Sequence, residues 1–152
     1  MAHYLMDSSA VAKRYMIETG SDWIEALCLD AHSTVILAEI TLAEVASTFA
    51  RASRGRRITE AQRIEYLDLF TNDCNRAYQL IPVNRFIIDH AVTLTQRYRL
   101  RGYDAVQLAC ALRANELLIE RALPPLTFIT ADRDLIAAAI PEGLISENPN
   151  DH

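Results

Sequence analysis

The stretch Tyr4-Leu5-Met6-Asp7-Ser8-Ser9-Ala10 decides the fold of this 152-residue chain. Its first three residues are apolar and predict a short strand that ends at Asp7. Because serine is a favoured helix N-cap, either Ser8 or Ser9 is expected to begin a helix directly after that strand. The stretch therefore predicts a strand–helix unit with an aspartate at its junction.

The same alternation of apolar strands and helices continues along the chain. Further strands are predicted at 34–38, 78–83, 126–129 and, as a short last strand, 144–145. Helices are predicted between them at 21–28, 40–53, from residue 59 onward, 84–98, 104–121 and 132–140. Helices that alternate with strands predict βαβ units around a parallel sheet, and strands that are nearly all apolar indicate that both faces are covered.

Two of these helices carry predicted start signals. Ser21 is expected to cap the helix at 21–28, and Thr59 the helix that follows it, where Gln62 completes a capping-box pattern. No linker, repeat or low-complexity segment divides the chain. Residues 1–152 are therefore expected to form one α/β domain with four to five strands.

The composition argues against several classes of protein. A hydrophobic fraction of 51% is too high for a disordered chain, and no apolar run approaches the ~18 residues of a membrane span. The first residues lack a basic start followed by a long apolar stretch, so no secretory signal is expected. Three separated cysteines provide neither a disulfide framework nor a zinc-ligand pair. We therefore expect a cytoplasmic protein with no membrane partner.

The charged residues limit how the chain can bind nucleic acid. A net charge of −5 argues against binding through the overall field, although local charge still decides contact. All the basic residues except Lys13 are arginines, and they cluster at 51–57 and at Arg97, Arg99 and Arg101. Guanidinium groups suit phosphate or carboxylate partners, whereas solvated helix ends and loops are the ordinary alternative.

Three aspartates stand at the ends of strands or the starts of helices. Asp7 and Asp132 follow predicted strands, so in a parallel sheet they lie at the same edge, where open α/β sheets bind ligands. Asp104 begins a helix after Arg101-Gly102-Tyr103 and joins them if that helix starts at the same edge. Helix capping explains each aspartate as well, because Asp is a favoured N-cap.

Glu44 is placed differently, in the middle of a predicted helix. At about 100° per residue, the core-facing stripe of this helix is expected to be Leu42, Ala46, Phe49 and Ala50. Glu44 falls outside that stripe, on a face shared with Thr41, Ser47, Thr48 and Arg51. Such a face is typical of solvent exposure, and the spacing alone gives no reason to choose Glu44 as a site residue.

Carboxylates gathered at one sheet edge repel one another and raise each other's pKa unless a cation is bound. Hard divalent ions prefer oxygen ligands, and the four histidines lack metal-ligand spacing, so Mg²⁺ or Mn²⁺ fits better than zinc. Such an ion activates water and stabilises charge on a phosphoryl group. The four isolated glycines form no phosphate-binding loop, and no Gly-x-Ser-x-Gly elbow is present. A phosphatase with Asp7 as nucleophile is disfavoured, because Ser9 occupies the place of its second aspartate.

Four stretches, in order along the chain, resemble the motifs of a known family. They are Tyr4-Leu5-Met6-Asp7-Ser8-Ser9-Ala10, Thr41-Leu42-Ala43-Glu44-Val45-Ala46, Tyr103-Asp104-Ala105-Val106-Gln107-Leu108-Ala109 and Phe128-Ile129-Thr130-Ala131-Asp132-Arg133-Asp134-Leu135. On these motifs the chain resembles PIN-domain ribonucleases, and most closely the VapC toxins of bacterial toxin–antitoxin pairs. Each motif is weak by itself, but four in the family's order and spacing are specific.

The resemblance implies an α/β/α sandwich and an acidic quartet of Asp7, Glu44, Asp104 and Asp132. It also implies endonucleolytic cleavage of RNA with Mg²⁺ or Mn²⁺, a homodimer, and a cognate antitoxin that blocks the site. We expect Asp7 and Asp104 to bind the metal directly, and Glu44 and Asp132 to act through water or on a second ion.

Two further residues and two rival functions remain open. Asp134 is a candidate helper or a helix-start residue, and Ser8 is a hydroxyl near the metal or a cap. The first rival function is a PIN-type nuclease of RNA processing rather than a toxin. The second is a non-catalytic interaction module that retains the fold.

Overall fold

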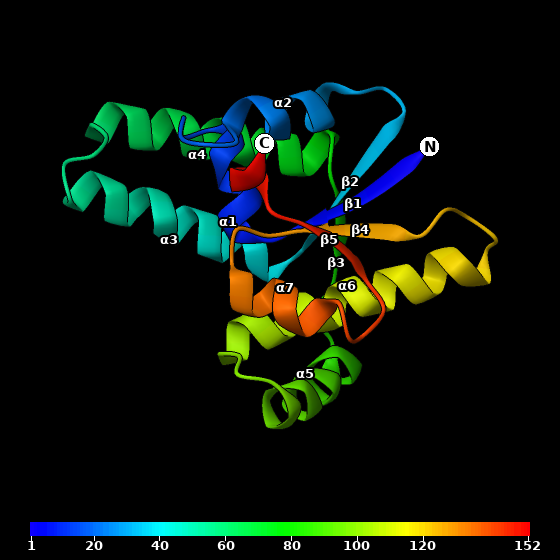
Figure 1. The fold of residues 1–152 in the computed structure, drawn as a ribbon. Coiled ribbons are helices and arrows are strands. Elements are labelled where there is room, and N and C mark those ends of the chain that lie inside the picture. Colours follow the sequence, from blue (N-terminus) through cyan, green and yellow to red (C-terminus); the bar gives the residue numbers. More distant parts are fainter.

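The computed structural model describes all 152 residues as a five-stranded sheet covered by helices on both faces (Figure 1). In chain order the elements are β1 (Ala2–Met6), α1 (Ser8–Val11), the 3₁₀ turn η1 (Ala12–Arg14), α2 (Ser21–Leu29), β2 (Ser33–Ala38), α3 (Ile40–Arg54), α4 (Glu60–Arg76), β3 (Gln79–Ile81), α5 (Arg85–Arg97), α6 (Gly102–Glu120), β4 (Leu126–Ile129), α7 (Arg133–Ala139), β5 (Ile145–Glu147) and the 3₁₀ turn η2 (Pro149–Asp151). The predicted α/β/α sandwich is confirmed.

The sheet is parallel throughout, in the order β3-β2-β1-β4-β5. β1 is the central strand, and Met6 at its end is in register with Ile129 of β4. On the other side, Ala38 of β2 is in register with Ile81 of β3. The carboxyl ends of these strands therefore share one edge, and Asp7 is the first residue beyond it on the central strand.

Two apolar cores lie on opposite faces of the sheet, because successive strand side chains point to opposite sides. Leu5 and Phe128 pack with α5, α6 and α7 on one face. Met6 and Ile129 pack with α1, α3 and α4 on the other. The three central strands, β1, β2 and β4, are thus buried on both faces, as their apolar sequences predict. No helix in the structure combines the length and the apolar character needed to span a bilayer.

The predicted start signals have mixed outcomes. The capping box of Thr59 and Gln62 is present at α4. The predicted serine cap of the first helix is wrong, because the Asp7 carboxylate accepts from the Ala10 N–H and is itself the N-cap of α1. Ser21 does not cap α2 either, since its hydroxyl donates to the carbonyl of Lys13 and Gly20 is the N-cap.

Gly20 has a specific reason to be glycine. Its φ of +86° lies in the left-handed region, and a Cβ at this position would lie 2.3 Å from the carbonyl oxygen of Pro149. The turn before α2 is therefore pressed against η2, near the C-terminus.

Two predicted strands differ in their bounds. The strand predicted at 78–83 is shorter, because Tyr78 packs into the core beneath α4 and Pro82 provides no N–H for the ladder. The last strand is shifted, since Leu144 is buried in the other core and its N–H bonds the carbonyl of Ala139 in the turn after α7.

The predicted core stripe of α3 is confirmed only at Phe49, and the difference matters for the site. Its buried residues are Thr41, Val45, Phe49 and Ala52. Leu42 and Ala46 are only half-buried. The inward face is therefore rotated from the predicted one, and the rotation brings Thr41 fully into the interior and Glu44 partly into it.

Candidate active site

Asp7 is held at the end of the central strand by three hydrogen bonds from neutral donors. Its Oδ1 accepts from the Ser9 hydroxyl at 2.6 Å and from the Ala10 N–H at 3.0 Å. Its Oδ2 accepts from the Thr130 hydroxyl at 2.6 Å. Thr130 follows β4, so two adjacent strand ends hold one carboxylate in a fixed position.

The environment of Asp7 is unfavourable for a negative charge. The side chain is 5% exposed, and burial raises the pKa of Asp7 to about 6, although the bonds from Ser9, Thr130 and Ala10 favour the ionised form. Repulsion from Glu44 raises the pKa further. No arginine or lysine forms an ion pair with Asp7.

Glu44 is anchored from the opposite layer of the sandwich. Its Oε1 accepts from the Gln107 side-chain amide of α6 at 2.7 Å, and the same amide nitrogen donates to Thr41 at 2.8 Å. Burial raises the pKa of Glu44, the Gln107 bond opposes that rise, and the charge of Asp104 adds to it. The helical position of Glu44 suggested a freely solvated side chain. The structure instead holds its carboxylate in place within the candidate site.

Asp104 and Asp132 approach from α6 and α7. Asp104 lies in the first turn of α6, whose N-cap is Arg101 rather than Asp104 itself. Asp132 is the N-cap of α7, with its Oδ1 accepting from the backbone N–H groups of Asp134 and Leu135 at 2.9 and 3.3 Å. Burial raises the pKa of Asp104, and the charge of Asp132 raises it further.

The four predicted acids thus form a row of mutually repelling neighbours along the sheet edge, from Asp7 through Glu44 and Asp104 to Asp132. No three carboxylate, imidazole or thiol groups converge on one point as a ready-made metal-ligand set. The donors nevertheless fit a hard divalent cation in their chemistry. They are all oxygen, none of them forms an ion pair, and the repulsion among them is what such an ion relieves.

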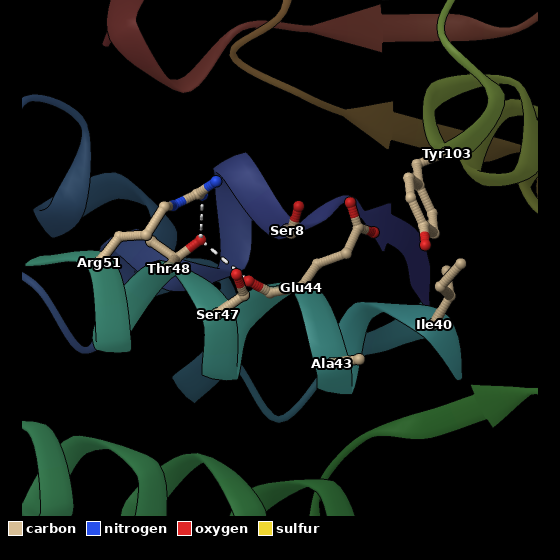
Figure 2. A pocket seen from close by; sticks show the side chains of 8 residues that line it. All are labelled: Ser8, Ile40, Ala43, Glu44, Ser47, Thr48, Arg51 and Tyr103. Carbon is tan, nitrogen blue, oxygen red and sulfur yellow. Dashed lines mark hydrogen bonds between the residues drawn. The ribbon is translucent and has the colours of Figure 1, made fainter.

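Two hollows are lined by acids of this row. The first, of about 380 Å³, lies along α3 and is lined by Ser8, Glu44, Arg51 and Tyr103 among others. Figure 2 shows the Glu44 carboxylate facing Ser8 and Tyr103, with Arg51 at the far end of the hollow. Arg51 forms no ion pair and donates only to the Thr48 hydroxyl, at 3.4 Å.

The second hollow, of about 560 Å³, lies between the loop before α6 and the start of α7. It is lined by Asp104, Asp132 and Asp134, together with Arg99 and Arg101. Neither of these arginines is in an ion pair, whereas Arg97 beside them pairs with Glu142. Arginines that form no ion pair therefore line both hollows, and the charge of Arg101 opposes the rise that burial causes in the pKa of Asp104.

Comparison with known proteins places the chain in a family. The family model described as "PIN domain" matches residues 4–141. The chain belongs to the PIN domain family. Ribonuclease VapC45 of Mycobacterium tuberculosis (strain CDC 1551 / Oshkosh) is 30% identical to this PIN domain over 110 residues, which are 72% of this chain and 75% of that protein.

Solved structures share the PIN fold at lower sequence identity. VapBC2 from Rickettsia felis, crystallised with a DNA fragment from its promoter, has a TM-score of 0.66 at 16% identity and covers 96% of this chain and 98% of its own. VapC20 of Mycobacterium tuberculosis, a toxin that cleaves the sarcin–ricin loop, has a TM-score of 0.62 at 14% identity, with 93% and 96% covered. The resemblance found in the four sequence motifs is confirmed at the level of the family and of the fold.

Several polar residues of this PIN domain were missed by reasoning from the sequence. Ser9 and Thr130 hold Asp7, and Gln107 holds Glu44 while also donating to the hydroxyl of Thr41. A signal was present for Thr130, since it directly follows a strand at the same edge as Asp7. Gln107 carried a weaker one, because it is a polar residue inside the otherwise apolar run of α6.

Proposed function

We propose that this PIN domain is a Mg²⁺-dependent endoribonuclease and the toxin of a toxin–antitoxin pair. The observation that carries the proposal is Asp7, a buried carboxylate at the end of the central strand whose donors are all neutral and whose neighbours in the row are acidic. A buried charge of this kind lacks a counter-ion, and a bound divalent cation supplies one. The VapC ribonuclease relative supports RNA as the substrate.

The four acids take different parts in this mechanism. Asp7 and Asp104 would hold the cation directly, and Glu44 and Asp132 would do so through water or on a second ion. When bound, the cation offsets charge on the scissile phosphate and lowers the pKa of a water molecule; Mn²⁺ is expected to substitute for Mg²⁺. Glu44 is suited to orient that water and accept its proton, because burial raises the pKa of its carboxyl.

The flanking arginines are suited to hold the RNA backbone. Arg51 at the end of the first hollow, and Arg99 and Arg101 in the second, can each donate to phosphate without giving up an ion pair. They explain how an acidic protein can bind a polyanion, since contacts near the cleavage site do not depend on the net charge of −5.

The decisive experiment is cleavage of RNA by purified Asp7→Asn and Asp104→Asn, each with Mg²⁺ and with EDTA. Losing a direct ligand is expected to lower the rate on the order of 10³-fold or more, and EDTA should abolish cleavage by the wild type. Asp68→Asn on the exposed face of α4 is the matched control, because it removes one charge far from the row. Near wild-type cleavage by either site variant would refute the assignment.

The partner proposals rest on the relatives. Structural neighbours include toxin–antitoxin complexes, such as one from Klebsiella pneumoniae and FitAB bound to DNA. An antitoxin is expected to place an arginine or lysine among the acids, where a cation can take the place of the metal. Induced expression should arrest growth, a co-expressed partner gene should restore it, and Asp7→Asn should be harmless.

A homodimer is also proposed. The side chains of Phe86, Ile88 and Val92 on α5 are apolar and exposed, and they provide apolar surface that self-association would bury. Light scattering at micromolar concentration tests this, and a pure monomer counts against it.

Two alternative functions can each be tested by a specific experiment. A housekeeping PIN nuclease would cleave RNA without arresting growth and would lack a neighbouring gene for a small DNA-binding partner. A non-catalytic module would fail to bind Mn²⁺ at all, and calorimetric titration of the wild type measures that directly.

A further inference from the structure

A buried amide lies between the two helices that carry Glu44 and Asp104. Gln107 is one turn beyond Asp104 on α6 and is 2% exposed. Its Nε2 donates to Glu44 Oε1 at 2.7 Å and to Thr41 Oγ1 at 2.8 Å, so both of its amide hydrogens are used. Thr41 and Glu44 are themselves one turn apart on α3, and the single amide bridges the two helices at that turn.

The other atom of this amide is left without a partner. Gln107 Oε1 is buried and accepts no hydrogen bond. Rotating the amide by half a turn would let Oε1 accept from the Thr41 hydroxyl, but it would also turn a carbonyl oxygen toward the Glu44 carboxylate. The observed orientation leaves one acceptor unsatisfied and gives an N–H to an anion, and this is the choice expected where Glu44 is ionised.

We propose that Gln107 is a positioning residue for the reaction, which fixes the Glu44 carboxylate relative to Asp104 so that both can serve one bound cation. This inference rests on the proposed metal-dependent nuclease function. The structure holds Asp7 through Ser9, Thr130 and Ala10. Glu44 has the Ser8 hydroxyl close by, but its 2.7 Å hydrogen bond comes from Gln107. Without it, the Glu44 side chain is free to move away from Asp104, which repels it.

A merely structural amide would behave differently on substitution. A methionine has nearly the shape of glutamine, and it removes both the donor to Glu44 and the unsatisfied Oε1. If Gln107 served only the packing of α6 on α3, Gln107→Met would leave metal binding unchanged. If it positions Glu44, the same variant would retain the fold and lose metal affinity.

The experiment compares Gln107→Met with Thr41→Val, which keeps the bond to Glu44 and removes only the other partner of the amide. Mn²⁺ affinity is measured by calorimetry, melting temperature by circular dichroism, and kcat and KM on RNA with Mg²⁺. We expect Gln107→Met to melt within about 4 °C of the wild type and to lose about 10- to 100-fold in Mn²⁺ affinity and kcat, with KM little changed. Thr41→Val is expected to stay within about threefold of the wild type in Mn²⁺ affinity and in kcat, since the Gln107–Glu44 bond persists.

A double-mutant cycle separates positioning from a general weakening. In Glu44→Gln there is no carboxylate left to position, so adding Gln107→Met should change Mn²⁺ affinity no further, whereas independent effects would add. Should Gln107→Met fail to fold, Gln107→Asn retains an amide that is too short to reach Glu44, and the same loss is expected. Wild-type Mn²⁺ affinity and kcat in these variants, or equal damage from Thr41→Val, would overturn the proposal.

Failure of the positioning role of Gln107 can be distinguished from failure of the proposed nuclease function. If the wild type cleaves no RNA but Gln107→Met still weakens Mn²⁺ binding, the positioning role stands and the ribonuclease assignment falls. If Asp7→Asn abolishes cleavage while Gln107→Met cleaves as the wild type does, the ribonuclease stands and the positioning role falls.

Discussion

Two hydrogen-bond networks each hold one aspartate, and they differ in the charge beside it. The edge network consists of Asp7 with Ser9, Ala10 and Thr130, all of which donate as neutral groups. In the tyrosine network, the Tyr15 hydroxyl donates to Asp73 at 2.6 Å and contacts the Tyr78 hydroxyl at 2.7 Å, while Arg14 lies 3.5 Å from the same Asp73 oxygen.

The difference teaches what each network is suited to do. In the tyrosine network the guanidinium of Arg14 supplies the opposite charge, and burial raises the pKa of Tyr15, so that its hydroxyl stays a donor. That network joins η1 to the end of α4 and needs nothing from outside. The edge network holds a carboxylate with no cation near it, which lowers stability but leaves a charge for a ligand to neutralise.

The largest expected effect is a pH dependence that belongs to the edge network. The folded-state pKa of Asp7, about 6, lies above the ordinary value of 3.8, so between these values the folded protein binds a proton more tightly than the unfolded chain does. The free energy of unfolding should therefore fall as the pH rises from about 4 to about 6, by about 3 kcal/mol from this residue. Asp7→Asn should remove that contribution and be at least as stable as the wild type at neutral pH.

Urea unfolding of both proteins across this pH range, without divalent ions, measures the difference. Subtracting the two curves removes most of the contribution of Glu44 and Asp104, whose raised pKa values act in the same direction. Mg²⁺ should restore the wild type at neutral pH and have less effect on the variant. Identical pH profiles would show that Asp7 is an ordinary carboxylate and would break the comparison.

The second prediction removes the cation from the tyrosine network. Arg14→Met should cost about 2 kcal/mol of unfolding free energy, less than for a fully buried ion pair, because the side chains of Arg14 and Asp73 keep 17% and 23% exposure. The rate of RNA cleavage per folded molecule should not change, since this network does not contact the acidic row. A variant that is stable but inactive would contradict the division of roles.

The sequence predicted the parts of the fold and the site that depend on local patterns. Apolar runs identified β1, β2 and β4, and the rule that ligands bind beyond the carboxyl ends of parallel strands found Asp7 and Asp132. The capping box of Thr59 was predicted because both of its residues lie within one helical turn. Asp104 was plausible from its helix start alone.

Glu44 could not be found from periodicity, because the face that α3 buries is decided by its partners. Packing against α1 and α4 buries Val45 and Phe49, and the amide of Gln107 allows the polar Thr41 to be buried beside them. The bonds that define the site also join residues far apart in sequence, 63 positions for Gln107 and Glu44 and 123 for Thr130 and Asp7. Only the family motifs brought Glu44 into the quartet.

The third prediction removes one hydroxyl from the edge network. Thr130→Val keeps the shape of a fully buried side chain and leaves Asp7 Oδ2 without its donor. The carboxylate is then less fixed and less readily ionised, so cleavage should fall about tenfold, equivalent to about 1.4 kcal/mol. Assays at two Mg²⁺ concentrations test whether added metal recovers part of the rate. A variant with the wild-type rate would show that Ser9 and Ala10 suffice to hold Asp7.

The smallest expected effect is the matching deletion in the tyrosine network, Tyr15→Phe. The ring keeps its edge-on contacts with Phe49 and Phe70, and only the hydroxyl is lost. Asp73 still has Arg14 at 3.5 Å, and the Tyr78 hydroxyl still accepts from Arg14 at 2.8 Å, so neither polar group is left alone. We expect a cost of about 1 kcal/mol in urea unfolding and an unchanged cleavage rate. Loss of one hydroxyl should therefore lower activity in the edge network but only stability in the tyrosine network. Arg14 remains beside Asp73 to replace the lost partner, whereas no cation lies beside Asp7 to do so.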